Sequence, residues 1–171
     1  MVMALLEKLL EKECYEGQGD LVAQKILDFM AKEKVVVTPR IIDMFSIFRI
    51  VSFKMIPFVP GLVNYLIEHL INSCPKWSDS LEDLSLRGCT YLSDTALLKA
   101  CKFEKLKNID VSFCERLSDM GLIHLLGLKG LTSVDLRGCD LVTEVGLGVL
   151  KTMNLKMIMC HHEDSNPIDL F

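Results

Sequence analysis

The chain has 171 residues, a formal net charge of −4 and an apolar fraction of 50%. This length and composition predict one domain with a sizeable buried core. The mild acidic excess argues against a nucleic-acid-binding protein, which would carry a basic stripe. The sequence has no uninterrupted run of about 18 apolar residues, so no membrane span is expected.

Residues 1–46 predict a helical N-terminal region. Leucines form an apolar stripe over residues 2–14, and a second helix is expected over residues 21–31 with Asp20 as its N-cap. The β-branched residues 35–37 predict either an edge strand or a turn into a short helix. We expect this region to cap the first edge of the structure that follows. The alternative is that its helices bind a partner.

Residues 47–80 are interpreted as a degenerate first repeat. A loosely alternating stretch over residues 48–55 predicts a strand, and residues 62–73 predict an amphipathic helix. The following Cys74-Pro75 pair is expected to end that helix, because proline cannot continue it.

Residues 81–160 carry a repeated pattern, Leu-x-x-Leu-x-Leu-x-x-Cys, in three full copies at 81–89, 106–114 and 131–139. A fourth copy begins at Leu155 and fades after Cys160, and the four starts are 25, 25 and 24 residues apart. A fixed period of this length predicts a stack of similar structural units.

Each copy predicts one strand and one helix. The end of the leucine pattern alternates apolar and polar residues, which is typical of a short strand with one buried face. A Ser or Thr followed by an acid (Ser93, Ser118 and Thr143) then predicts a helix start. Stacked copies predict an α/β solenoid with parallel strands on a concave face and helices on the convex face.

The phrases Leu-Arg-Gly-Cys at 86–89 and 136–139, and Leu-Ser-Asp at 92–94 and 117–119, resemble the cysteine-containing class of leucine-rich repeats. That class occurs in F-box/leucine-rich-repeat and antagonist-of-mitotic-exit-type proteins, and the resemblance covers roughly the C-terminal half. It implies a non-enzymatic protein–protein interaction module. The setting implied is substrate recognition or an adaptor role in ubiquitin ligation, in the cytoplasm or nucleus, with ubiquitin-ligase components as partners.

The short chain is also similar to small mitochondrial proteins of the ATP synthase coupling-factor B and distal-membrane-arm assembly type. This second resemblance implies an assembly or coupling factor of a respiratory complex or the ATP synthase, in mitochondria. The early charges Glu7 and Lys8 are not typical of a secretion signal, and the acidic start is not typical of a mitochondrial transit peptide.

The candidate partner-binding site is a strip of polar residues that the strand alternation places on the concave face. The strip consists of Asp83, Ser85, Arg87, Asn108, Asp110, Ser112, Ser133, Asp135 and Arg137. All are expected to be exposed. Two interpretations are open: the neighbouring acids Asp110 and Asp135 pair internally with Arg87 and Arg137 on a solvated face, or the strip recognises a basic or mixed partner segment.

Seven cysteines, an odd number without a secretion signal, predict reduced thiols. Cys89, Cys114 and Cys139 recur at the same point of each copy, where thiolates could bind zinc. The resemblance implies instead that they are small buried residues bonded to the turn backbone, and we predict no metal or cofactor. No phosphate-binding, nucleophile-elbow or metalloprotease motif is present in the sequence, so no catalytic residue is predicted.

Residues 161–171 are interpreted as a C-terminal tail, because no full helix is expected after the fourth strand. An uncovered last strand would expose unpaired backbone groups. The tail could fold back over it, the strand could pair with another copy of the chain, or the chain could be part of a longer repeat protein.

Overall fold

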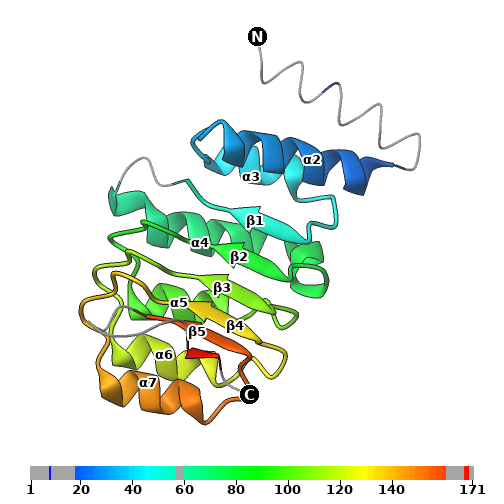
Figure 1. Ribbon diagram of the computed structural model, residues 1–171. Coiled ribbons are helices and arrows are strands. Elements are labelled where there is room, and N and C mark those ends of the chain that lie inside the picture. The colour runs from blue at the N-terminus through cyan, green and yellow to red at the C-terminus, as the bar shows by residue number, and fades with distance from the viewer. Residues whose placement is uncertain (1–7, 9–17, 57–59, 161–167, 170–171) are drawn as a thin grey trace.

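The computed structural model describes residues 8, 18–56, 60–160 and 168–169. Five short parallel strands form one sheet in chain order, and a sixth strand adds to its end (Figure 1). Their bounds are β1 Ser52–Lys54, β2 Asp83–Ser85, β3 Asn108–Asp110, β4 Ser133–Asp135, β5 Met157–Met159 and β6 Ile168–Asp169. The α/β fold class expected from the sequence is therefore confirmed.

A helical segment follows each of the first four strands. In Figure 1 these helices lie in a row along one side of the sheet, and each contacts the next. Their bounds are η1 Pro60–Leu62, α4 Val63–Ser73, η2 Pro75–Asp79, α5 Asp94–Ala100, α6 Asp119–Leu125 and α7 Glu144–Lys151. No helix in the described part of the chain is long and apolar enough to cross a membrane.

The 25-residue period of the sequence becomes the register of the sheet. Leu84 of β2 pairs with Ile109 of β3, which pairs with Val134 of β4. Equivalent residues of successive copies are therefore side by side, so a residue type repeated in the sequence forms a row across the sheet.

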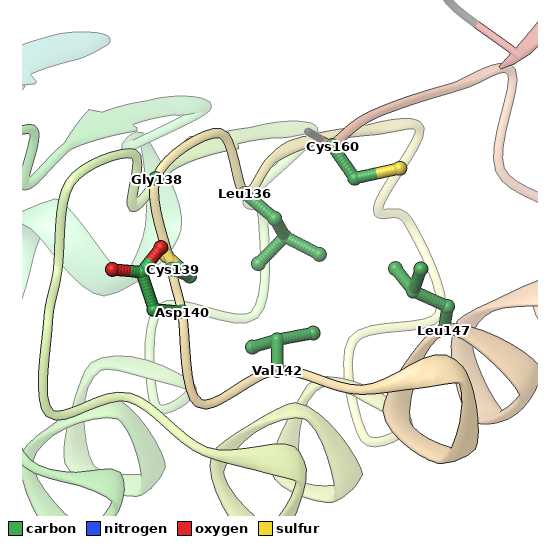
Figure 2. Close-up of a pocket in the computed structure, with 7 residues that line it drawn as sticks. All are labelled: Leu136, Gly138, Cys139, Asp140, Val142, Leu147 and Cys160. Atoms are coloured by element: carbon green, nitrogen blue, oxygen red, sulfur yellow. The ribbon is translucent and has the colours of Figure 1, made fainter. Parts of the chain in front are cut away.

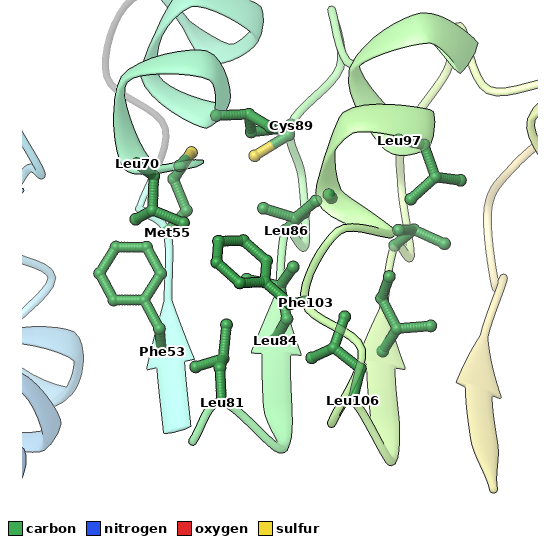
Figure 3. Packing of buried hydrophobic residues seen from close by; sticks show 14 of the residues in the cluster. Phe53, Met55, Leu70, Leu81, Leu84, Leu86, Cys89, Leu97, Phe103 and Leu106 are labelled. Carbon is green, nitrogen blue, oxygen red and sulfur yellow. The ribbon is translucent and has the colours of Figure 1, made fainter. Parts of the chain in front are cut away.

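The core lies between the sheet and the helices. Figure 3 shows Leu84 of β2 and Leu86, which directly follows β2, on the same side of the sheet as Leu97 of α5 and Phe103 from the loop after α5, and these four side chains are buried. Full burial of one such side chain stabilises the fold by about 1.5–3 kcal/mol. A single copy has no such partner surface, which is why the copies are stable only when stacked.

The predicted helix starts are confirmed, and each is bonded to the preceding helix. Ser93, Ser118 and Thr143 are the N-caps of α5, α6 and α7, and each side chain accepts a backbone N–H of the first turn. The acids that follow them have a further role. Asp94 accepts the Ser118 hydroxyl at 2.6 Å, and Asp119 accepts the Thr143 hydroxyl at 2.6 Å.

The N-terminal region contains α2 Gly19–Lys32 and α3 Pro39–Phe45, while the helix expected over residues 2–14 lies outside the described residues, Lys8 excepted. Asp20 was expected to cap α2, but it lies within the helix and its carboxylate accepts the backbone N–H of Arg49 at 2.9 Å. Residues 35–37 form no strand but an irregular segment that leads into α3, and Thr38 caps α3.

Helix α2 protects the free edge of β1 with one side chain. The Gln24 amide donates to the Ser52 carbonyl at 2.8 Å and accepts the backbone N–H groups of Val51 and Ser52 at 2.9 and 3.1 Å. It therefore satisfies the groups to which a neighbouring strand would otherwise bond.

The segment interpreted as a degenerate first repeat, residues 47–80, departs from the expected alternation. Strand β1 falls within the predicted stretch, yet Ile50 is buried together with Phe53 and Met55, although strict alternation places it on the opposite face. The helix α4 begins one residue later than expected and leaves Leu62 exposed, and it ends before Pro75 as predicted.

The C-terminal end of the sheet is covered by the chain itself. Strand β6 pairs antiparallel with β5, matching Ile168 to Ile158 and Asp169 to Met157. Of the three possibilities for the tail, folding back is therefore the one observed for Ile168–Asp169.

Candidate partner-binding face

The face of the sheet opposite the helices carries the polar strip. Because Leu84, Ile109 and Val134 are buried in the core, their neighbours along each strand lie on the other side. The register places Asp83 beside Asn108 and Ser133, and Ser85 beside Asp110 and Asp135. Arg87, Ser112 and Arg137 follow at the ends of the three strands. The structure thus brings together all the residues expected at this face.

A hollow of about 360 Å³ lies over these strands. Residues from five neighbouring strands line it: Ser52, Lys54, Asp83, Leu84, Ser85, Arg87, Asn108, Ile109, Asp110, Ser133, Asp135 and Met159. Nine of these twelve residues are polar, while the side chains of Leu84 and Ile109 point into the core. The hollow is open to a ligand that lies across the strands.

Asp110 at the centre of the strip is bonded on both oxygens. One oxygen accepts the Ser85 hydroxyl at 3.0 Å, and the other accepts the hydroxyl and backbone N–H of Ser112 at 2.6 and 3.0 Å. This bonding draws Ser112 under the carboxylate, and Ser112 is 0% exposed. The expectation that Ser112 is exposed was therefore wrong.

Asp135 was also expected to be exposed, but it is only 4% exposed. The guanidinium of Arg137 folds back over it, with Nη2 2.6 Å from one carboxylate oxygen and Nε 3.0 Å from the other. The bonds and the charge of Asp135 raise the pKa of Arg137. The expected pairing of this acid with an arginine is confirmed for Arg137.

Arg87 stands at the equivalent position two copies earlier, but its surroundings differ. Its Nη1 donates to the Ser112 hydroxyl at 3.3 Å, and its guanidinium carbon lies 4.7 Å from the centre of the Phe113 ring. It forms no ion pair with any described residue, so its expected pairing with the acids of the strip is not observed.

Phe113 and Lys54 belong to this face and were missed by the sequence prediction. Phe113 has a φ of 60° and is 43% exposed, whereas the equivalent residues Gly88 and Gly138 have the same left-handed backbone with a φ of 71°. The signal was present in the sequence, because Ser-Phe-Cys replaces Arg-Gly-Cys in the second copy. Lys54 was missed because β1 lacks the repeat pattern.

The cysteine column is buried behind the turns. The thiols of Cys114 and Cys139 donate to the carbonyls of Leu86 and Val111 at 3.3 and 3.1 Å. Burial raises the pKa of Cys89 to about 12 and that of Cys139 to about 11. Protonated thiols are poor metal ligands, and no cluster of three or more metal-binding side chains occurs among the described residues.

His69 on α4 has a carboxylate partner that the sequence did not suggest. Its Nε2 lies 2.8 Å from an Asp43 oxygen on α3 and 3.4 Å from the Ser73 hydroxyl. A Ser-His-Asp relay uses the two different ring nitrogens. Here the serine and the carboxylate share one nitrogen, so the contact connects two helices and has no relay geometry.

A second hollow, of about 180 Å³, lies beyond the last full copy (Figure 2). Figure 2 shows the apolar side chains of Leu136, Val142 and Leu147 around it, with Cys160 at its edge. Burial raises the pKa of Cys160, which keeps the thiol protonated. Leu136, Val142 and Leu147 with two protonated thiols offer no group for catalysis or metal binding, so we assign this hollow no function.

Comparison of the chain with protein-family models, and with curated proteins, gave no match.

Proposed function

We propose that this protein is a non-enzymatic recognition module, built as a short array of leucine-rich repeats, that binds a protein partner across the open face of its sheet. One observation carries the proposal. Polar side chains from adjoining strands are in register on the face opposite the helices, beneath a hollow of about 360 Å³. A rigid parallel sheet holds such side chains at fixed spacing, which favours recognition of an extended or flat protein surface.

The proposed setting is ubiquitin ligation, in which the module serves as a substrate-recognition or adaptor component in the cytoplasm or nucleus. Its support is the resemblance of the repeated Leu-Arg-Gly-Cys and Leu-Ser-Asp phrases to the repeats of F-box/leucine-rich-repeat proteins. A fold of this kind supports many binding functions, so the partner decides the setting.

A second setting is favoured by the small number of copies, three full and one partial. Small mitochondrial coupling and assembly factors are similar in this respect, and the partner would then be a subunit of a respiratory complex or the ATP synthase.

Affinity purification of the tagged chain from its own cells, with mass spectrometry of the bound proteins, tests the proposal. Asn108→Trp would fill the hollow from an exposed strand position, whereas Leu98→Trp would place the same side chain on the outer side of α5. We expect partners to be lost with Asn108→Trp and kept with Leu98→Trp. Equal recovery from both variants would contradict binding at this face.

The identity of the recovered partners separates the two settings. A cullin or a ligase adaptor would support the ubiquitin setting. Respiratory-complex or ATP synthase subunits would support the mitochondrial one.

A further inference from the structure

The acids of the polar strip accept hydrogen bonds from neighbouring residues, on both oxygens at Asp110 and Asp135 and on one oxygen at Asp83. Asp83 accepts the amide of Asn108, and Asp110 accepts three donors from Ser85 and Ser112. Asp135 is buried under Arg137. A basic ligand would have to compete with these existing donors in order to reach the carboxylate of Asp110 or Asp135.

The two cations that line the same hollow, in contrast, keep most of their hydrogen-bond donors unused by other described residues. Lys54 and Arg87 both line it and both are exposed. Within the described residues neither forms an ion pair, and the only side-chain hydrogen bond of the two is that of Arg87 to Ser112. The formal charges of the acids and bases at this face nearly cancel. The class of ligand that fits is therefore decided by the unused hydrogen-bond donors of Lys54 and Arg87 and not by the net charge.

Arg87 is also held in place. The ring of Phe113 supports the guanidinium from below, and Ser112 fixes one of its nitrogens. Phe113 is itself fixed, because its left-handed backbone permits few ring positions and its ring packs over Gly138. A guanidinium already oriented loses little freedom on binding a carboxylate, which it can engage through two parallel bonds.

The spacing of the two cations defines the ligand further. Lys54 is paired in register with Ser85, and Arg87 lies two residues beyond Ser85 along the same strand direction. One strand spacing across and two residues along separate the two Cα atoms by about 8 Å. Alternate residues of an extended peptide point to the same side about 6.6 Å apart, which long lysine and arginine side chains can match.

We propose that the open face selects an extended peptide segment of its partner that carries two acidic residues at alternate positions, bound by Lys54 and Arg87. This inference rests on the proposed recognition function and names the chemistry of its ligand. It replaces the basic or mixed segment expected from the sequence, which assumed that the acids of the strip were exposed and available.

The test is selection of random dodecapeptides displayed on phage against the immobilised full chain. The decisive variant is Lys54→Gln/Arg87→Gln. Its control is Lys105→Gln/Arg116→Gln, which removes the same charge: Arg116 lies 4.2 Å from the Tyr91 ring in a similar stacked arrangement but does not line the hollow. All four residues are exposed, and thermal melting of both variants verifies their folding.

We expect peptides selected on the unaltered chain and on the control to be enriched at least twofold in Asp and Glu. The enrichment should disappear with Lys54→Gln/Arg87→Gln. A selected peptide resynthesised for fluorescence anisotropy should bind that variant at least tenfold more weakly, and more weakly to the unaltered chain as salt is raised. Enrichment in Lys and Arg, or unchanged acidic enrichment with the decisive variant, would overturn the inference.

Asn108→Trp separates failure of this inference from failure of the proposed function. Neutral or basic peptides that are lost with Asn108→Trp would leave the open face as the binding site and overturn only its acidic selectivity. Selected peptides that Asn108→Trp does not affect would overturn both.

Discussion

Phe113 has a backbone conformation that its neighbours in the stack achieve with glycine. A left-handed φ brings the Cβ of an ordinary residue close to its own carbonyl, at a cost of about 1–2 kcal/mol. The ring offsets part of this cost, because it packs over Gly138, where an added Cβ would lie 2.6 Å from the ring edge, and beneath the Arg87 guanidinium. A strained residue retained beside an exposed arginine is consistent with a role in binding.

Comparison of Phe113→Gly with Phe113→Ala measures this strain. Both variants lose the ring, but only alanine keeps a Cβ in the left-handed turn. We predict that the glycine variant is the more stable of the two by about 1 kcal/mol, after allowing for the greater freedom of glycine in the unfolded chain. The free energy of unfolding of both variants is measured by urea denaturation. An alanine variant that is as stable as the glycine variant, or more stable, would contradict a left-handed backbone at position 113.

Asp119 makes stability depend on pH through the cap of α7. Hydrogen bonds from the hydroxyl and backbone N–H of Thr143 lower the pKa of Asp119. Because the pKa of Asp119 is lower in the folded chain than in the unfolded chain, the ionised carboxylate stabilises the fold at pH values above the unfolded-state pKa of about 3.9. This stabilisation is lost as the pH falls through the folded-state pKa. We predict that Asp119→Asn lowers the free energy of unfolding at pH 7, and that the difference is smaller at pH 2.

Asp140→Asn is the matched control for that experiment, because Asp140 is exposed and makes no side-chain hydrogen bond to a described residue. Its stability should follow that of the unaltered chain at both pH values. A loss in Asp119→Asn that is the same at pH 2 as at pH 7 would show that the carboxylate charge is not responsible.

At the scale of the elements, helix α7 contains two glycines with different surroundings. A Cβ added at Gly146 would overlap the Asp119 carboxylate and lie 3.0 Å from the Leu122 side chain, whereas a Cβ at Gly148 would meet nothing within 4 Å. The missing Cβ at Gly146 allows α6 and α7 to approach closely enough for Asp119 to bond to Thr143. Gly148 has no such role.

Replacing each of these glycines by alanine should therefore have opposite effects. Gly148→Ala should stabilise the protein by about 0.5–1 kcal/mol, because alanine is the better helix former. Gly146→Ala should destabilise it by about 1–3 kcal/mol through overpacking. Both values come from urea denaturation at pH 7, and stabilisation by Gly146→Ala would contradict the helix contact described here.

The repeated elements could be predicted from the sequence because the same residue pattern recurs in each copy. The 25-residue period gave the strands and their neighbours, and Ser93, Ser118 and Thr143 gave the helix starts. Residues 18–56 carry no such pattern. There the capping role expected for Asp20 was wrong, because its carboxylate bonds to Arg49, which is close only in the folded chain.

The sequence was enough to place the polar strip on one face of the sheet. It was not enough to predict which side chains of the strip are exposed to solvent. Strand alternation tells only which way a side chain points. The burial of Ser112 and Asp135 depends on the side chains of Asp110 and Arg137, which bond to them from two residues away on the same strand segment. That bonding also decides which charges remain available to a ligand.

At the scale of the whole molecule, the two ends of the sheet are covered by different means. Gln24 of α2 satisfies the backbone of β1, and the returning strand β6 covers β5. Both arrangements leave the central face open while preventing the edges from pairing with other strands.

A chain ending at residue 167 would lack β6 and expose the edge of β5. We predict that this shortened chain self-associates as its concentration rises, whereas the full chain does not, because an uncovered strand edge pairs readily with another. Sedimentation velocity over a hundredfold concentration range measures the difference. If the shortened chain sediments as a monomer throughout, β6 is not what protects this edge.

Photocrosslinking in living cells tests recognition by the open face most directly. A photoreactive amino acid at position 108 lies at the hollow, and one at position 98 lies on the outer side of α5 as its control. We predict that position 108 forms a discrete crosslink to a protein partner, identified by mass spectrometry, and that position 98 gives none to that partner. Crosslinks to the partner from position 98 alone would contradict the assignment and place recognition on the helices.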